Sequence, residues 1–213
     1  MTRENIISER IRSLAAKVLD KPQLDASDYQ KLTVYVNATI AKDPWNVKNV
    51  LLAADIYQRQ IDSSRSPKER TARIVSAVEV LQTALHLGKN IEISKRLAAL
   101  YAELRKYDLA EQYSDEVLAN DKDLAALGIK GDCCVARRDF PVALGYYTEA
   151  LKYEPANNEL LAKKAYCLLQ TGKYNEALEA VNASLKYTPT DFAKRIKKEI
   201  TNLLRKNKIA FEG

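Results

Sequence analysis

The stretch that decides the fold is residues 124–191, in which one pattern is written twice. The first half, residues 124–157, reads LAALGIKGDCCVARRDFPVALGYYTEALKYEPAN, and residues 158–191 read NELLAKKAYCLLQTGKYNEALEAVNASLKYTPTD. The positions that match at an interval of 34 residues are Leu127 with Leu161, Gly131 with Ala165, Phe140 with Tyr174, Ala143 with Ala177, Tyr147 with Val181, Ala150 with Ser184 and Pro155 with Pro189. Self-similarity at such a period indicates a repeat protein whose unit is one supersecondary element.

The repeated pattern resembles the tetratricopeptide repeat family. Small residues at equivalent places in successive helices, and the run GKYNEA at residues 172–177, carry the resemblance. It implies helix-turn-helix units stacked into an all-α superhelix, or solenoid, closed by a C-terminal capping helix. The composition agrees, because six Gly and six Pro among 213 residues suit long helices.

In the phase of this pair, we predict a single solenoid domain over residues 1–213. Its units are a degenerate repeat at 4–44, an expanded repeat at 47–90, repeats at 91–123, 124–157 and 158–191, and a capping helix at 192–210. The step from Tyr57 to Ala77 is 20 residues, whereas the matching step from Tyr101 to Ala110 is 9. The extra residues fall around 61–73, as a lengthened helix pair with a loose connector, which we favour, or as a loop on a binding face.

Several helix limits follow from local signals. Apolar spacing predicts a helix over Thr2 to Asp20 and a second one that begins at Ser27 or Asp28 and stops at Asp43 and Pro44. Gly88 suits the C-terminal cap of a helix. After Pro189, Asp191 suits an N-cap, and Phe192, Ile196, Ile200, Leu203 and Leu204 form the apolar face of the capping helix.

Charge and cysteine usage narrow the class of protein. The net charge of +6 divides into 14 basic and 10 acidic residues in 1–90, 13 and 15 in 91–190, and 7 and 3 in 191–213. Without a run of 18 apolar residues or an uninterrupted signal sequence, we expect a soluble, cytoplasmic protein. Cys133, Cys134 and Cys167 are expected to be small buried hydrophobes rather than disulfide partners or metal ligands.

No constellation of residues predicts catalysis. The single histidine, His86, lies between two leucines near the expected end of a helix, where it packs more often than it acts as a base. The chain has no Gly-rich phosphate loop, no Ser-His-Asp set and no metal-ligand spacing. We therefore predict a protein that is not an enzyme and has no cofactor and no metal.

A binding groove is what the family resemblance implies instead. In tetratricopeptide arrays the first helix of each pair lines a concave groove. The residues placed there are Glu92, Lys95, Arg96 and Ala99 in one repeat, Gly128, Ile129 and Asp132 in the next, and Lys163, Tyr166 and Gln170 in the last. Lysine and arginine at such places can hold a carboxylate or an acidic peptide, although solvated helix faces carry charges anyway.

One family function can be examined position by position. Tetratricopeptide co-chaperones clamp the terminal carboxylate of acidic tails with two Lys, two Asn and an Arg on three successive first helices. Lys95 and Lys163 fall at basic clamp positions, whereas Ala99 and Ile129 stand in place of Asn and Glu159 in place of the second Lys. The clamp implied by the resemblance is therefore incomplete.

The basic end of the chain offers an alternative. Lys194, Arg195, Lys197 and Lys198 could touch RNA, an anionic membrane surface or an acidic protein. We favour the capping role for this helix, since its apolar face is needed to close the array. The sequence thus predicts a non-catalytic adaptor or scaffold subunit of a larger complex that binds a protein or peptide, with self-association possible and nucleic acid or membrane as the lesser alternatives.

Overall fold

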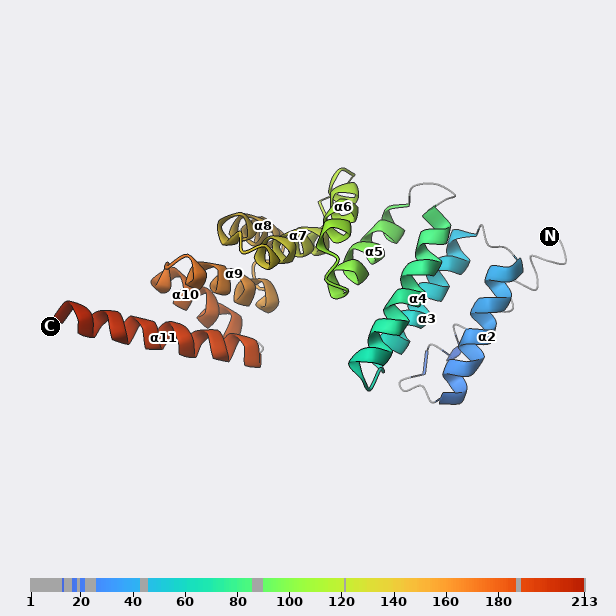
Figure 1. Ribbon diagram of the computed structural model, residues 1–213, viewed down its shortest axis with the longest axis horizontal. Helices are drawn as coiled ribbons and strands as arrows, with labels where there is room; N and C mark the ends of the chain where they lie inside the picture. The colour runs from blue at the N-terminus through green and yellow to red at the C-terminus, as the bar shows by residue number, and fades with distance from the viewer. Residues whose placement is uncertain are drawn as a thin grey trace. The chain divides into compact units, whose positions relative to one another are not determined.

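The chain is all-α in the part that the computed structural model describes, namely residues 26–42, 46–85, 90–120, 122–186 and 189–212 with positions 13, 17, 18, 20 and 21. These residues form no strand and ten helices (Figure 1): α2 Ala26–Lys42, α3 Val47–Asp62, α4 Pro67–Leu85, α5 Ile91–Glu103, α6 Tyr107–Leu118, α7 Leu124–Ala136, α8 Phe140–Tyr153, α9 Asn158–Gln170, α10 Tyr174–Leu185 and α11 Asp191–Glu212. The predicted fold class is confirmed. Most of the expected helix from Thr2 to Asp20, the helix end at Asp43 and Pro44, His86 and the Gly88 cap lie outside the described residues.

The chain divides into two compact units, Met1–Leu100 and Tyr101–Gly213, which we call the N-terminal and C-terminal units. In the N-terminal unit, α2 packs on α3 and α3 on α4. Leu32 of α2 is buried with Ala53 and Ile56 of α3, and Gln60 Nε2 donates a hydrogen bond to Thr33 Oγ1 at 3.3 Å. Tyr29 Oη also donates a hydrogen bond to the Arg59 carbonyl at 3.2 Å. An apolar stripe and these polar contacts therefore join α2 to α3.

In the expanded pair α3 and α4, the extra residues lengthen the two helices. The two helices are 16 and 19 residues long, and only residues 63–66 connect them. The connector is held locally, because Ser63 Oγ and Ser64 Oγ both donate to the Gln60 carbonyl and Ser66 Oγ accepts from the amide of Glu69. Residues 61–73 thus comprise the end of α3, a short hydrogen-bonded turn at 63–66 and the start of α4, rather than an extended loop.

In the C-terminal unit, α6 to α11 pack each on the next, and α11 also contacts α9. Two first helices begin at side-chain caps: Asp123 accepts from the amide of Ala126 at 2.9 Å, and Asn157 accepts from that of Leu160 at 3.0 Å. Such caps satisfy backbone amides that the helix leaves without a partner.

Successive first helices end in the same turn. At the turns after α5, α7 and α9 one residue has a positive φ: Arg105 at 56°, Arg138 at 62° and Gly172 at 76°. The next amide bonds back to the carbonyl five residues earlier, from Lys106 to Tyr101, Asp139 to Cys134 and Lys173 to Leu168. This is the Schellman arrangement, which prefers glycine at the left-handed position.

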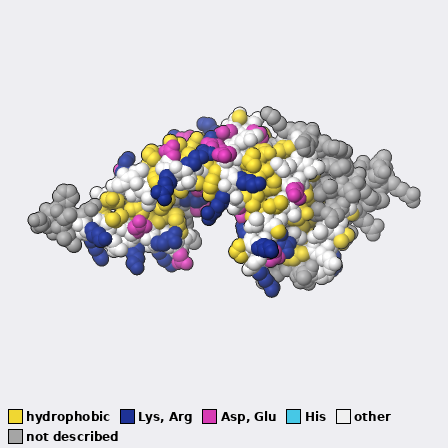
Figure 2. Space-filling model, viewed as in Figure 1, with side chains coloured by type: hydrophobic (Ala, Val, Ile, Leu, Met, Phe, Trp, Pro, Cys, Tyr) yellow, Lys and Arg dark blue, Asp and Glu magenta, His cyan; other side chains and the backbone are white. Residues whose placement is uncertain are grey.

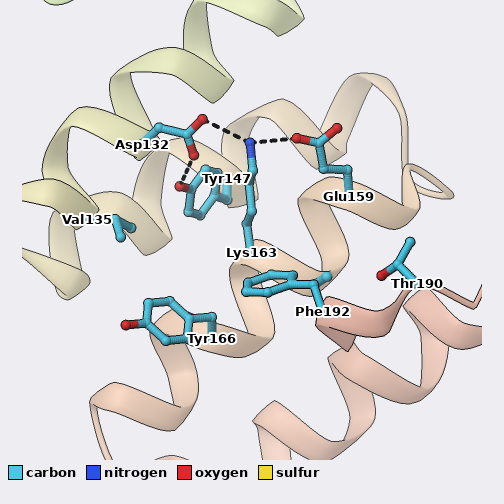
Figure 3. Close-up of a pocket in the computed structure, with 9 residues that line it drawn as sticks. Asp132, Val135, Tyr147, Glu159, Lys163, Tyr166, Thr190 and Phe192 are labelled. Carbon is cyan, nitrogen blue, oxygen red and sulfur yellow. Dashed lines mark hydrogen bonds and ion pairs between the residues drawn. The ribbon is translucent and has the colours of Figure 1, made fainter. Parts of the chain in front are cut away.

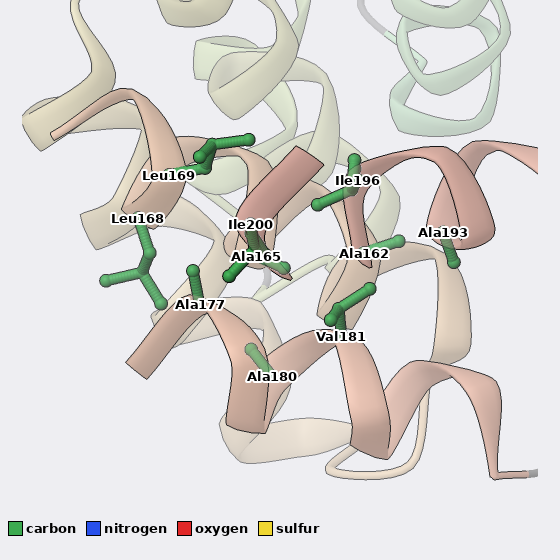
Figure 4. Packing of buried hydrophobic residues seen from close by; sticks show 10 residues of the cluster. All are labelled: Ala162, Ala165, Leu168, Leu169, Ala177, Ala180, Val181, Ala193, Ile196 and Ile200. Atoms are coloured by element: carbon green, nitrogen blue, oxygen red, sulfur yellow. The ribbon is translucent and has the colours of Figure 1, made fainter. Parts of the chain in front are cut away.

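The last helix closes the hydrophobic core of the C-terminal unit. Ala193, Ile196 and Ile200 of α11 are buried with residues of α9 and α10 (Figure 4), namely Ala162, Ala165, Leu168, Leu169, Ala177, Ala180 and Val181. The predicted capping helix is therefore confirmed. Its buried face differs by one residue from the expected one, because Ala193 is fully buried whereas Phe192 is 37% exposed.

Candidate functional site

A pocket of about 580 Å³ lies in the C-terminal unit, between α7, α8, α9 and the start of α11 (Figure 3). Its lining residues are Asp132, Val135, Tyr147, Glu159, Ala162, Lys163, Tyr166, Thr190 and Phe192. Pockets for drug-sized ligands have volumes of about 300–1,000 Å³. The pocket is therefore large enough to hold a side chain together with some of its backbone.

Helical spacing brings the pocket residues together. On α9, Glu159, Ala162, Lys163 and Tyr166 are separated by three, one and three residues, which places them on one face of the helix. Asp132 and Val135 lie three residues apart on α7, and the packing of α8 between α7 and α9 brings in Tyr147. The segment after the last repeat completes the site with Thr190 and Phe192.

The polar part of the pocket is an ion-paired lysine. Lys163 Nζ lies 2.9 Å from Asp132 Oδ2 and 2.7 Å from Glu159 Oε1. Tyr147 Oη donates a hydrogen bond of 2.7 Å to the other oxygen of Asp132. Asp132 thus joins α7 to both α8 and α9.

The surroundings of Lys163 and Tyr147 raise the pKa of both side chains. Burial lowers the pKa of Lys163, but Asp132 and Glu159 outweigh that effect, so its pKa lies above the ordinary lysine value. Burial, followed by the negative charge of Asp132 and their hydrogen bond, raises the pKa of the Tyr147 phenol. Lys163 therefore stays charged and Tyr147 stays protonated.

Aromatic rings form the apolar wall of the pocket. Tyr166 and Phe192 line the pocket with their ring centroids 6.2 Å apart. The ring of Phe140, which is not a lining residue, meets that of Tyr166 edge to face at 5.9 Å. The Arg195 guanidinium covers the Phe192 ring at 5.8 Å. Such rings supply a large apolar area at fixed positions, which suits recognition of a bulky apolar group.

The predicted groove residues of the C-terminal unit divide into two groups. Asp132, Lys163 and Tyr166 line the pocket, whereas Ile129 is half-buried and Gln170 is exposed away from the lining. Gly128, also expected in the groove, is buried instead, and a Cβ there would lie 3.7 Å from the Leu160 side chain. Sequence reasoning missed Val135, Thr190 and Phe192 as groove residues, and it considered Glu159 only as a mismatch with the carboxylate clamp.

The predicted groove residues of the N-terminal unit form a separate cluster. Arg96 Nη1 lies 2.6 Å from Asp55 Oδ1, and Arg96 Nε lies 3.1 Å from Glu92 Oε1. Burial lowers the pKa of Arg96, but these two carboxylates raise it more. Lys95 is half-buried beside it. The guanidinium thus already holds two acidic side chains of its own chain.

The four basic residues predicted on the capping helix are all exposed. They are Lys194, Arg195, Lys197 and Lys198. Figure 2 shows Lys and Arg side chains gathered along α11 on the face in view. Lys194 Nζ lies 3.5 Å from Asp191 Oδ1, and Arg195 stacks on Phe192.

The cysteines carry no reactive thiolate. Cys133, Cys134 and Cys167 are buried and unbridged. Burial raises the pKa of Cys133 to about 11 and that of Cys167 to about 12, which keeps both in the thiol form. Among the described residues, no group of three or more His, Cys, Asp or Glu is placed to hold a metal ion, and no helix is long and apolar enough to cross a membrane.

Comparison with known proteins connects this architecture to a family. A tetratricopeptide repeat family model matches residues 135–195. BBSome complex member BBS4 from Bos taurus is 27% identical over 188 residues, which is 84% of this chain and 36% of that protein. Hsp70-Hsp90 organizing protein 1 from Glycine max is 30% identical over 115 residues, or 54% of this chain and 19% of that protein. The chain thus spans about a third or less of the length of these two relatives.

A solved structure shows the same fold. A tetratricopeptide repeat protein from Parabacteroides merdae superposes with a TM-score of 0.71 at 20% identity, covering 96% of this chain and 76% of that one. At this identity the likeness concerns the fold alone. The family match over 135–195 and the regular pairs α7–α8 and α9–α10 show tetratricopeptide repeats in this part of the C-terminal unit.

Proposed function

We propose that this chain is a non-catalytic protein-binding module, an adaptor or scaffold subunit, that holds a segment of a partner protein in the pocket of the C-terminal unit. The observation that carries the proposal is the 580 Å³ pocket, which the repeats and the capping helix build together. Its wall is aromatic and its lysine is held by two carboxylates, which suits binding rather than turnover.

The relatives support this class of function. Tetratricopeptide repeats are protein-interaction modules, and the two relatives are named as a complex member and an organizing protein. A larger assembly is therefore the proposed setting, with a cytoplasmic location as a continuing prediction. The identity of the assembly is not inherited from either relative, because most of each relative's length has no counterpart here.

The pocket is poorly suited to the two alternative ligands, a terminal carboxylate and a polyanion such as RNA or a membrane surface. A terminal carboxylate would need a lysine that is not already paired, whereas Lys163 holds Asp132 and Glu159. The neutral amides that would support a clamped carboxylate are also missing, since Ile129 and Ala99 stand at those positions. RNA or an anionic membrane would have to bind along α11, where the basic residues are exposed, without using the pocket.

A peptide-display selection on the whole chain tests the proposal. Selected peptides should bind the purified chain in solution and lose about fivefold or more in affinity when Phe192 is replaced by Ala, since an aromatic pocket wall is removed. The matched control is Tyr153→Ala, because Tyr153 is 44% exposed on α8 and does not line the pocket. The proposal fails if no peptide is enriched, or if both variants bind the enriched peptides as the unmodified chain does.

A further inference from the structure

We infer that the pocket selects a partner segment in which a bulky apolar side chain has a Lys or Arg neighbour, and that it rejects acidic neighbours. The inference rests on the proposed function, since it names the chemistry of the segment held there. It also reverses the preference for acidic tails that Lys95 and Lys163 suggest in the sequence.

The charges of the pocket lining are unequal in number. Asp132 and Glu159 contribute two negative charges, and Lys163 is the single basic residue among those that line the pocket. The lining therefore carries one net negative charge. Arg195 lies over the Phe192 ring but is not one of the lining residues.

The charges of the lining differ in how accessible they are to a ligand. The Lys163 side chain is 24% exposed, whereas that of Glu159 is 76% exposed. Both oxygens of Asp132 are engaged, one by Tyr147 and the other by Lys163. The lysine is thus covered by its partners, and the most accessible charge is the Glu159 carboxylate, which has capacity for further hydrogen bonds.

The apolar side chains of the lining offer a second kind of contact. Figure 3 shows the ammonium group of Lys163 between its two carboxylates, with the rings of Tyr166 and Phe192 away from them. Val135 and Ala162 add aliphatic surface to the lining. An apolar side chain on the rings and a cation beside Glu159 would therefore satisfy the two parts of the pocket at once.

The test is a display library in which a fixed central Leu or Phe is flanked by random residues, selected on the whole chain. We expect Lys and Arg to be enriched, and Asp and Glu depleted, at the flanking positions. One enriched basic peptide is then resynthesised with Gln at its basic positions, and both peptides are titrated by fluorescence anisotropy. Glu159→Gln should reduce the preference for the basic peptide about two- to fivefold, as expected for an exposed ion pair.

The control variant makes the same replacement of Glu by Gln at a position outside the pocket. Glu179→Gln, on the exposed side of α10, should leave the preference unchanged. Enrichment without a charge preference, enrichment of acidic flanks, or a preference that survives Glu159→Gln would overturn this inference while the proposed function stands. Failure to enrich any peptide would overturn both.

Discussion

Replacing Gly131 by alanine should destabilise the C-terminal unit, although alanine is the better helix former. A Cβ at Gly131 would lie 2.4 Å from Cε1 of Tyr147, and 2.8 Å from two further ring atoms. Tyr147 is 1% exposed and its hydroxyl is bonded to Asp132, so the ring cannot withdraw toward the pocket without disturbing that hydrogen bond. The ring or one of the helices α7 and α8 must therefore move.

The expected size of the effect follows from two opposed contributions. Alanine gains about 1 kcal/mol over glycine inside a helix. Overpacking of a filled core costs about 1–3 kcal/mol, and displacing the ring also weakens a hydrogen bond to a charged acceptor, at about 1.5 kcal/mol or more. The net loss should be about 2 kcal/mol, or roughly 4–8 °C in melting temperature for a chain of this size.

A matched control lies on the same helix. A Cβ at Gly128 would meet Leu160 at 3.7 Å, an ordinary contact, so Gly128→Ala should stabilise by about 0.5–1 kcal/mol. Thermal unfolding of the three proteins, followed by circular dichroism at 222 nm, compares them directly. Equal melting temperatures for the two alanine variants would refute the steric argument.

The second repeat suggests how to relieve the clash. The positions equivalent to Gly131 and Tyr147 are Ala165 and Val181, both fully buried in one core. A double variant, Gly131→Ala with Tyr147→Val, transplants this pair. We expect it to be more stable than the sum of the two single effects predicts, by about 1 kcal/mol or more, in a double-mutant cycle. Simple additivity would mean that the two side chains do not compete for the same space.

Two further predictions concern turns and thiols. Gly172→Ala should destabilise by about 1 kcal/mol, and Arg138→Gly should stabilise by up to about 1 kcal/mol, because both positions have positive φ; opposite shifts in melting temperature are the check. Cys133 and Cys167 should resist iodoacetamide in the native chain at pH 8 and react after unfolding in urea, as measured by mass spectrometry. Folding raises the pKa of both thiols, so their contribution to the free energy of unfolding is complete below the unfolded pKa of about 8.5 and is lost as pH rises toward 11–12. A melting temperature that did not fall between pH 8.5 and 11 would contradict this.

The regular repeats could be predicted because each helix pair is determined by residues close together in the sequence. Helices α7 and α9 begin 34 residues apart, at Leu124 and Asn158, and α8 and α10 begin at Phe140 and Tyr174 with the same interval. Each helix buries its own small and apolar residues at a fixed spacing, so the periodicity of the sequence follows directly from the packing. Gly131 and Tyr147, which lie in the adjacent helices α7 and α8, are part of the same repeated spacing.

The chemistry of the pocket could not be predicted in this way. The distance of 2.9 Å between Lys163 and Asp132 depends on how α7 and α9 pack across 31 residues of sequence. A lysine at a groove position looks available to an acidic ligand until its partners are known. The sequence therefore predicted the positions of three pocket residues, Asp132, Lys163 and Tyr166, but not the net charge that a ligand would meet.

The capping helix explains why the pocket has no sequence motif of its own. Amphipathic spacing placed Phe192 on the buried face, but at the first turn of α11 the smaller Ala193 fits against the preceding helices and is fully buried. Phe192 is thereby turned toward Tyr166 and into the pocket wall. Of these two adjacent residues, Ala193 thus packs in the core and Phe192 lines the pocket. Since burial of Ile196 and Ile200 holds α11 in place, the pocket wall depends on the same packing that ends the repeat array.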